Sequence, residues 1–532
     1  MRSKAIKLTL NNNKGQSMLL LVGTIAVIIV MMIGVYKALT DTNINSSGSH
    51  KARQIAIEAA DAGINQMISD ITNRQVNIIG ATLPMTLSYP VQISGTSLTV
   101  PVTINTLLDS INNPVLDLEG NQRYIVDAIA TPIIAYGAGR KVPITRHVRS
   151  HVTIVNMAKY NAFTIANDIW AGGNSFDGPY HCNGTTLSIG GTMYWNSSVL
   201  SSGGANPFFS DTYVTMSAGT IVQAGGYGTP DFRTMTSKHG RNSSSGSYDI
   251  CTSSSRPSGT WFDKAHGGAV VNIRPIPYQT YNNYAQVILQ LSNLPSYRLN
   301  GADTSSTTLT IDVGVSGYTP RIKINLSAFG TNSSDDLFDG MTNYVAALQS
   351  TYGIIIYCID DVAVYGQLPV VAGTANTNKK VMIISQKSIE LIGDILYSGD
   401  NYNTLPSYNP AVPTPIPSTS NPTNDAIALI CSGSIYVNPW RLTNTAFFHQ
   451  SDDMKIDGYL YGYSGALEGA GRTYNSGGSS SITQFTTFGG QTFNHGATVP
   501  GTFNVGYDPT LANNISKLVP VGVGVISWME MQ

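Results

Sequence analysis

Residues 16–36, QSMLLLVGTIAVIIVMMIGVY, contain no Asp, Glu, Lys or Arg. A helix rises about 1.5 Å per residue, so a helix over this run is about 30 Å long, which matches the hydrocarbon thickness of a bilayer. Because positive charge favours the cytoplasmic side, we predict that residues 1–15 stay in the cytoplasm and that the rest of the chain lies outside. The charged residues before the run are all basic: Arg2, Lys4, Lys7 and Lys14.

The exported part is polar but carries little charge. The whole chain has 30 Lys and Arg against 31 Asp and Glu, so only 11% of its 532 residues are charged, compared with about 25% in ordinary soluble domains. A net charge of −1 predicts no nucleic-acid partner, since such binding needs a basic surface. Four cysteines lie far apart, so disulfides and unpaired buried thiols both remain open: Cys182, Cys251, Cys358 and Cys431.

A second helical pattern follows the apolar run. In residues 50–71, apolar residues recur at spacings of three and four, with polar residues between them, which predicts an amphipathic helix. The sequence SSGS at residues 46–49 disfavours helix and predicts a kink or a break between the two helical stretches. The apolar positions are Ala52, Ile55, Ala56, Ala59, Ala60, Ile64, Met67, Ile68 and Ile71.

Two motifs at this end of the chain resemble a known family. Lys14-Gly15 before the apolar run, and KARQIAIEAADAGINQMI at residues 51–68, resemble the N-terminus of PilX-type minor pilins and of the K-type pseudopilins of type II secretion. The segment from Arg53 to Gly63 is similar to that family's R-x-x-A-x-x-A-A-E-A-G pattern at nearly every position. The resemblance implies insertion in the bacterial inner membrane, cleavage by a prepilin peptidase between Gly15 and Gln16, and assembly with other pilins or pseudopilins.

The resemblance also assigns filament packing to particular residues of the helix: Leu20, Arg53, Ala56, Ala59, Ala60 and Gly63. Two positions depart from the family pattern. The mature chain would begin with Gln16 instead of Phe or Met, and its fifth residue is Leu20 where most pilins have Glu. In the family that Glu is thought to pair with the N-terminal amine of a neighbouring subunit. The K-type pseudopilins also lack it and sit at the filament tip, so the resemblance implies a tip position.

An uncleaved signal anchor is the alternative for residues 1–40, with the alanine-rich helix as a stalk beside the membrane. The chain would then be a surface adhesin tethered to the membrane. A cleaved secretory peptide fits less well, because the apolar run is long and VYKALTDT (residues 35–42) is a poor cleavage site.

The rest of the chain is predicted to be mainly β. Residues 74–157 alternate apolar with polar residues, which predicts an antiparallel sheet packed on the helix of residues 16–73, as in pilins. Residues 158–532 repeat short β-forming stretches with glycine, which favours a β-solenoid-like head over an ordinary β-sheet, although the period is irregular. Residues 239–260 and 406–425 are predicted loop insertions because they are rich in Ser, Gly and Pro.

Parts of the head resemble the passenger domain found behind PilX-type N-termini in envelope proteins. The similar segments are FDGPYHCNG (residues 176–184), ELIGDILYSGD (390–400) and GYDPTLANN (506–514). They imply a domain type and little chemistry. A surface or carbohydrate ligand of this head is the expected kind of external partner.

Candidate catalytic residues are few. His181 with Asn183, and His449 with Asp452 and Asp453, are the polar groups that would suit an acid/base pair, and a carbohydrate-active enzyme is the third hypothesis. No motif orders a nucleophile, a base and an orienting group, so we predict no catalytic residue. Residues 333–340, SSDDLFDG, have the composition of a calcium loop without its ligand spacing, so we predict no metal and no cofactor.

Overall fold

The computed structural model describes residues 2–79, 81–116, 121–136, 140–166, 353–368, 379–398, 424–437, 453–469, 484–497, 502–508 and 519–531, with shorter segments between 168 and 326 and single residues near 500 and 510. The side chains of residues 2–16 are not described. The described part is mainly β with one long N-terminal helix, which confirms the predicted fold class. The predicted insertions at 239–260 and 406–425 lie almost entirely outside the described residues.

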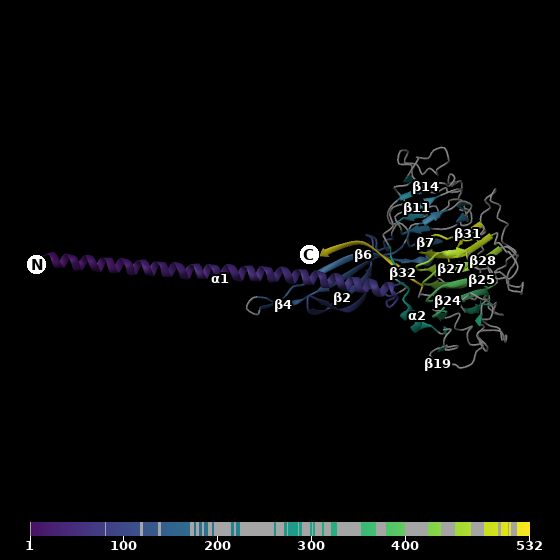
Figure 1. Cartoon of the computed structure of the whole chain (residues 1–532), viewed down its shortest axis with the longest axis horizontal. Helices are drawn as coiled ribbons and strands as arrows, with labels where there is room; N and C mark the ends of the chain where they lie inside the picture. The colour runs from purple at the N-terminus through teal and green to yellow at the C-terminus, as the bar shows by residue number, and fades with distance from the viewer. Residues whose placement is uncertain are drawn as a thin grey trace.

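The N-terminal helix α1 (Arg2–Thr72) is continuous and projects far beyond the rest of the molecule (Figure 1). The predicted kink or break at residues 46–49 is wrong, because α1 runs through them without interruption. Ser and Gly lower helix stability by about 0.5–1 kcal/mol each, which is too little to end a helix that is extended on both sides. Side-chain hydrogen bonds one turn apart support the second half, for example from Gln54 to Glu58 and from Gln66 to Asp70.

A six-stranded sheet packs against the second half of α1, and we call it the stalk sheet. Its order in the described residues is β1 (Met85–Ile93), β2 (Thr96–Thr106), β3 (Arg123–Ala130), β6 (Arg146–Asn156), β32 (Val521–Met531) and β16 (Val271–Asn272), with all neighbours antiparallel. Alternate residues of β1 to β3 are buried, so one face forms a core with α1. Ile64, Met67, Val100, Val126 and Val152 belong to this core.

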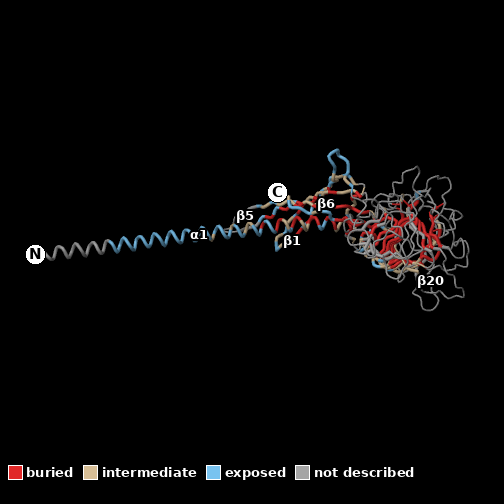
Figure 2. Tube along the Cα trace, turned by 90° about the horizontal axis from the view of Figure 1, so that it is seen from above, coloured by how far each residue is buried: buried red, intermediate tan, exposed pale blue. Residues whose placement is uncertain are grey.

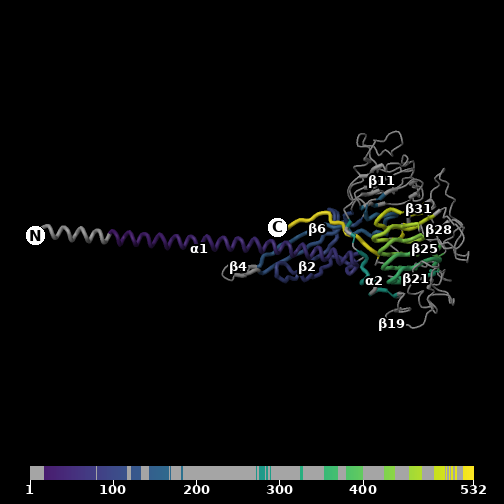
Figure 3. Tube along the Cα trace, in the orientation of Figure 1, coloured from purple at the N-terminus to yellow at the C-terminus, as the bar shows by residue number. Residues whose placement is uncertain are grey.

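The last strand of the chain belongs to the stalk sheet and not to the head. The predicted division at residue 157 is therefore wrong at the C-terminus, since β32 pairs with β6 along nearly its whole length. The chain leaves the sheet at Asn156, forms the head, touches the sheet through the short strand β16 and returns to it at Val521 (Figure 3). Local alternation cannot reveal this pairing, because Ser150 and Ser527 are 377 residues apart in sequence.

The head consists of parallel strands stacked in a solenoid-like arrangement. From β21 to β29 successive strands alternate between two long runs, so each of these coils adds one strand to each run. The first run is β17 (Val287–Leu289), β22 (Ile354–Cys358), β24 (Lys380–Ser385), β26 (Ala426–Cys431), β28 (Asp453–Gly462), β30 (Gln484–Phe493), β7 (Ala162–Thr164), β10 (Tyr180–Cys182) and β13 (Val214–Met216). The second run is β21 (Arg321–Asn325), β23 (Val362–Gln367), β25 (Ile389–Leu396), β27 (Ile435–Val437) and β29 (Leu467–Gly469).

Shorter runs complete the head. The first halves of β28 and β30 pair with each other and begin a third run of parallel strands. This run goes on through β31 (Thr502–Tyr507), β9 (Ser175–Phe176) and β12 (Tyr194–Trp195). A separate parallel run contains β8 (Asp168–Trp170), β11 (Thr186–Ile189) and β14 (Thr220–Gln223). Two antiparallel strands lie at the outer ends, β15 (Thr260–Trp261) on β14 and β20 (Ile311–Asp312) on β21, and a small hairpin joins β18 (Arg298–Leu299) to β19 (Ala302–Asp303).

The order of the coils in space differs from their order in the chain. The chain enters the head at β7, in the middle of the stack, and builds outward through β10 and β13. It then starts again at the opposite end with β17 and builds back until β30 pairs with β7. The crossings that join β6 to β7 and β31 to β32 therefore both lie at the middle of the head.

The central strands β22 and β26 of the first run are buried on both faces. They read as the unbroken apolar stretches IIIYC and AIALIC, which is typical of parallel sheets covered on both sides. The outer face packs against the short helix α2 (Tyr278–Tyr284) and the turn η1 (Met157–Lys159) through Met157, Tyr281, Tyr357 and Tyr459.

Three contacts fix the head to the stalk. The Thr280 hydroxyl of α2 donates to the carbonyl of Asn73 at the end of α1, at 2.9 Å. Asn183 of the head exchanges two hydrogen bonds with the backbone of Val271, at 2.8 and 3.0 Å, and Val271 lies in β16 of the stalk sheet. Asn121 donates to the hydroxyl of Tyr160 beside β7. The head is thus held by side chains as well as by the chain crossings.

Candidate functional site

The first half of α1 is the largest apolar surface of the described protein. Figure 2 shows it exposed along its length, whereas the second half is covered by the stalk sheet. Its large apolar side chains range from 45% exposed at Ile44 to 78% at Leu19. An exposed apolar surface of this size marks a contact with a membrane or with other protein. By length and composition this part of α1 could cross a membrane, and a signal anchor would have the same properties.

The predicted cleavage and packing residues fall on different parts of α1. Gly15 and Gln16 lie inside the helix, with side chains outside the description. Leu20 is 72% exposed and Arg53 is also exposed, so both are accessible to a neighbour.

The alanines and the glycine of the motif pack on the stalk sheet of the same chain. Ala56, Ala59 and Ala60 are fully buried within their own chain. A Cβ at Gly63 would lie 2.9 Å from Val100 and 3.0 Å from Val102 of β2. Small side chains at these positions therefore let α1 approach its own sheet, and their assignment to filament packing stays a prediction. The exposed residues of this half of α1 include Lys51, Arg53, Gln54, Glu58, Asn65 and Gln66.

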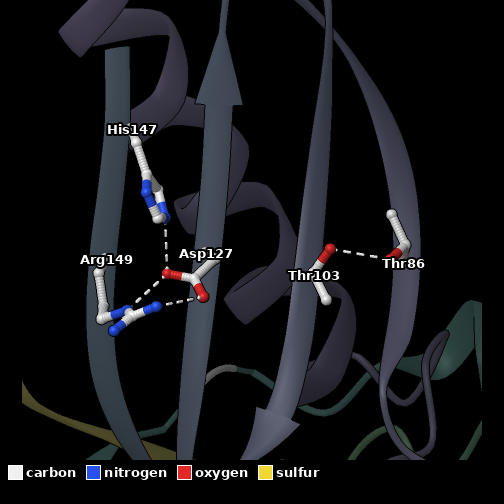
Figure 4. A network of polar contacts seen from close by, with 5 residues as sticks. All are labelled: Thr86, Thr103, Asp127, His147 and Arg149. Carbon is white, nitrogen blue, oxygen red and sulfur yellow. Dashed lines mark hydrogen bonds and ion pairs between the residues drawn. The ribbon is translucent and has the colours of Figure 1, made fainter. Parts of the chain in front are cut away.

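A polar network lies on the stalk-sheet face that points away from α1 (Figure 4). Asp127 of β3 accepts two hydrogen bonds from Arg149 of β6, at 2.7 and 3.0 Å, and lies 2.8 Å from Nε2 of His147. Beside it, the hydroxyls of Thr86 and Thr103 lie 2.8 Å apart. Burial raises the pKa of Asp127, but the bonds to Arg149 and His147 outweigh burial, so its pKa lies below the ordinary value. The network is a cross-strand clamp between β3 and β6.

The variant Asp127→Asn is expected to loosen the stalk sheet by about 1 kcal/mol at pH 7, because it removes a bidentate, half-buried ion pair. Since the pKa of Asp127 is lower in the folded state, its stabilisation is present above the unfolded pKa of about 4 and is lost as the pH falls through the folded value. Hydrogen exchange of β3 and β6 measures this difference between parent and variant, which should shrink below about pH 4.

The matched control is Thr86→Val on the same face, which removes a neutral hydrogen bond. Its effect should be independent of pH between 3 and 7. A difference between parent and Asp127→Asn that stays constant down to pH 2 would show that Asp127 acts by packing and not by charge.

The residues suggested for acid/base chemistry have structural surroundings where they are described. His181 is 0% exposed, is stacked on Phe163 at 4.6 Å and meets the edge of Tyr160. Asn183 holds β16, as described above. His449, Asp452 and residues 333–340 lie outside the described residues, and of Asp453 only the backbone, at the start of β28, is described. Among the described residues no group of three His, Cys, Asp or Glu side chains is arranged to hold a metal.

Buried charges in the head were missed by the sequence analysis. The carboxylate of Asp425 accepts from the backbone amides of Lys379 and Ser398, at 2.8 and 2.9 Å. Asp394 likewise accepts from the amide of Lys455, at 2.6 Å, and Asp457 from that of Tyr397, at 3.0 Å. Each carboxylate accepts a hydrogen bond from a backbone amide of another coil, so these side chains link neighbouring coils of the stack. In the sequence, the only sign of these buried carboxylates is an Asp within or next to an apolar strand.

The charge on these carboxylates is offset within the core. The ammonium of Lys455 lies 3.5 Å from Asp457, and both side chains are almost completely buried. Burial lowers the pKa of Lys379, and nearby Asp425 opposes that shift. This arrangement suits a paired structural network more than a catalytic one.

Two of the four cysteines are unpaired and buried. Cys358 and Cys431 lie in β22 and β26, and each pairs in register with Ser385 of the strand between them. Burial raises the pKa of both thiols, so neither is a reactive thiolate.

Fold and exposed surface together define a class: a mainly β protein whose solenoid-like head is displayed at the far end of a helix with an apolar, uncovered first half. No family model, curated protein or solved structure matches the chain.

Proposed function

We propose that the chain is a large, non-catalytic minor pilin or pseudopilin that is inserted in the bacterial inner membrane and assembled at the tip of a type IV filament. The observation that supports this most is the division of α1 into two halves. The first half is apolar and uncovered, and the second half is packed on an antiparallel sheet. A subunit built in this way offers its first half to the membrane before assembly and to neighbouring helices afterwards.

The head supports a role in surface contact. Its described strands lie at the end of the molecule opposite the N-terminus (Figure 1). The hydrogen bonds from Thr280 and Asn183 fix it to the stalk, so force on the head is transmitted to α1. We propose that it contacts a surface or a carbohydrate ligand. Its buried carboxylates bind backbone amides, which supports a role without catalysis.

A membrane-tethered surface adhesin is the second candidate. Gln16 and Leu20 depart from the pilin pattern, and α1 continues through both without interruption. In this case residues 1–15 remain attached and the same head is displayed from the cell membrane. A carbohydrate-active envelope enzyme is the third and weakest candidate.

Cleavage at Gly15 separates the first two candidates. Co-expression with a prepilin peptidase is expected to shorten the full chain by residues 1–15, because the basic leader and Gly15 fit that enzyme's site. In Gly15→Ala the added methyl group should block cleavage almost completely. Intact-mass measurement of the membrane fraction gives the result directly.

The control is Gly23→Ala, a glycine in the same helix with nothing within 4 Å of an added Cβ, which should be processed like the parent. A full-length parent chain, in cells that process their major pilin, would contradict the pilin proposal and favour the tethered adhesin.

A further inference from the structure

The stalk sheet has one open edge. Its strand β32 pairs with β6 on one side, but on the other side the short strand β16 covers only Val523 and Gly524. From Val525 to Met531 no other described strand lies beside β32, which runs next to α1 and away from the head (Figure 1). The outward backbone N–H and C=O groups of this segment can therefore pair with an added strand.

The open edge is apolar and exposed. Four of its large side chains are between 36% and 47% exposed: Val525, Ile526, Trp528 and Met529. Sheets usually protect their edges with charged residues or proline, and the opposite edge of the stalk sheet does so, since β1 contains Pro90. The one charged residue of β32 is Glu530, which lies 3.1 Å from Arg146 of the same sheet. The composition of this edge is that of a contact surface.

A β-bulge turns Trp528 toward α1. The register of β32 on β6 shifts between Val525 and Ser527. Trp528 therefore lies opposite Ser150, which is buried on the face of β6 that packs against α1. The indole N–H of Trp528 donates to Asp61 of α1 at 2.9 Å, and the side chain stays half exposed. An aromatic side chain that is fixed by a hydrogen bond and left half exposed is typical of an interface.

Asp61 belongs to a polar stripe on the side of α1 that borders the open edge. Residues at spacings of three and four lie on one side of a helix, which groups Asp61 with Gln54, Glu58 and Asn65. Gln54 donates to Glu58 at 2.8 Å, and Asn65 donates to Asp61 at 3.1 Å. These four residues include two carboxylates and no basic side chain. A partner at this edge is therefore favoured if it brings positive charge.

A second copy of this chain does not suit the open edge. Copies inserted in one membrane point the same way, so the open edge of one stalk sheet would meet the β1 edge of the next. Pro90 in β1 cannot donate a backbone hydrogen bond. The sequence of β1, MTLSYPVQI, also has no basic residue to meet Glu58 and Asp61. The occupant that fits is an extended segment of a different protein.

We propose that the free edge of β32 and the acidic stripe of α1 form a docking site for an extended segment of a neighbouring protein. The segment adds a strand to the stalk sheet by backbone hydrogen bonds, covers Trp528 with an apolar residue and places a Lys or Arg against Glu58 and Asp61. The site goes beyond the proposed function, because it is the same in a filament subunit and in a tethered adhesin. It joins the stalk to its neighbour and leaves the head free.

The test uses the full chain in detergent and a synthetic probe, a short peptide that alternates Val with Thr and carries Arg at both ends. Hydrogen exchange of residues 525–531 is expected to slow when the peptide binds, while exchange of β1 stays unchanged. A version with N-methylated backbone amides should not bind, because it cannot add to a strand. Glu58→Gln/Asp61→Asn should weaken binding of the probe by roughly 10-fold, since two exposed ion pairs are lost.

Trp528→Ala is expected to weaken binding of the probe by about 30-fold, because it removes the aromatic side chain that the added strand covers. Ile129→Ala is the matched control. Ile129 is also about half exposed, lies on β3 of the same sheet and is away from the open edge, so this variant should bind like the parent. Unchanged exchange of β6 in both free variants checks that the stalk sheet is intact.

Absence of binding by the probe would overturn the docking site. Equal binding by the N-methylated peptide would show apolar adsorption without strand addition, and would overturn it too. Self-association of the full chain that is lost in Trp528→Ala would assign the edge to a second copy, which also contradicts the proposal. Cleavage at Gly15 is measured separately, so none of these results decides the proposed function.

Discussion

Gly489→Ala is expected to prevent the head from folding. Gly489 lies in β30 with φ of +151°, a backbone conformation that residues with a side chain rarely adopt. A Cβ at this position would lie 2.0 Å from the carbonyl oxygen of Gly458 in the adjacent coil. Strained backbone and steric overlap each cost about 1–3 kcal/mol, so the variant should lose about 4 kcal/mol. Hydrogen exchange of β26, β28 and β30 is expected to lose its protection.

The two glycines lie opposite each other in register, at the bend where β28 and β30 pass from one run of strands to the next. The backbones approach here more closely than any side chain allows, so small shifts cannot relieve the overlap. Gly95→Ala is the matched control: Gly95 has φ of +79° but nothing within 4 Å of an added Cβ. It should cost only about 1 kcal/mol. A Gly489→Ala head as protected as that of Gly95→Ala would mean that the coils can separate at this bend.

Local patterns predicted α1 and much of the stalk sheet. An uncharged run of membrane length and a 3.6-residue period are properties of neighbouring residues, so the sequence alone reveals them. The break at residues 46–49 was predicted wrongly because propensity was weighed without the two long helical stretches that flank it. Small residues from Ala56 to Gly63 were correctly recognised as packing positions, but the sequence cannot say whether the partner is the same chain or another one.

Long-range pairings were not predictable. Nothing in VGVGVISWMEM distinguishes a last strand of the head from a strand that returns to β6, and the hydrogen bond from Trp528 to Asp61 joins residues 467 positions apart. The irregular period of the head has a similar origin. The segment that joins β25 to β26 runs from Leu396 to Ala426, whereas the one that joins β23 to β24 runs only from Gln367 to Lys380. Coils with similar apolar strands therefore contain different numbers of residues. The role of Asp394 and Asp425 could not be predicted from the sequence, because each accepts a hydrogen bond from a backbone amide of another coil.

Immunogold labelling of sheared filaments is expected to mark their ends and not their shafts. If Gly15 is the cleavage point, the fifth residue of the mature chain is Leu20, which is 72% exposed on the isolated subunit and has no carboxylate to offer. In the pilins that the N-terminus resembles, a Glu at this place is thought to neutralise the amine of a neighbour. An ammonium left without a partner in an apolar helix bundle costs several kcal/mol, so this subunit cannot be repeated along a fibre.

The head imposes a second, steric restriction on the same position. Its described strands extend beyond the stalk sheet on both sides (Figure 1), and the chain crossings with the contacts of Thr280 and Asn183 keep it from swinging aside. Copies packed at the spacing of a helical fibre would overlap, whereas one copy at the end meets no neighbour above it. Leu20→Glu separates the two restrictions, because it restores the carboxylate and leaves the head unchanged. We expect the variant to remain at filament ends, and spreading along the shaft would show that charge alone had excluded it. Labelling of the whole shaft by the parent chain would refute the tip position itself.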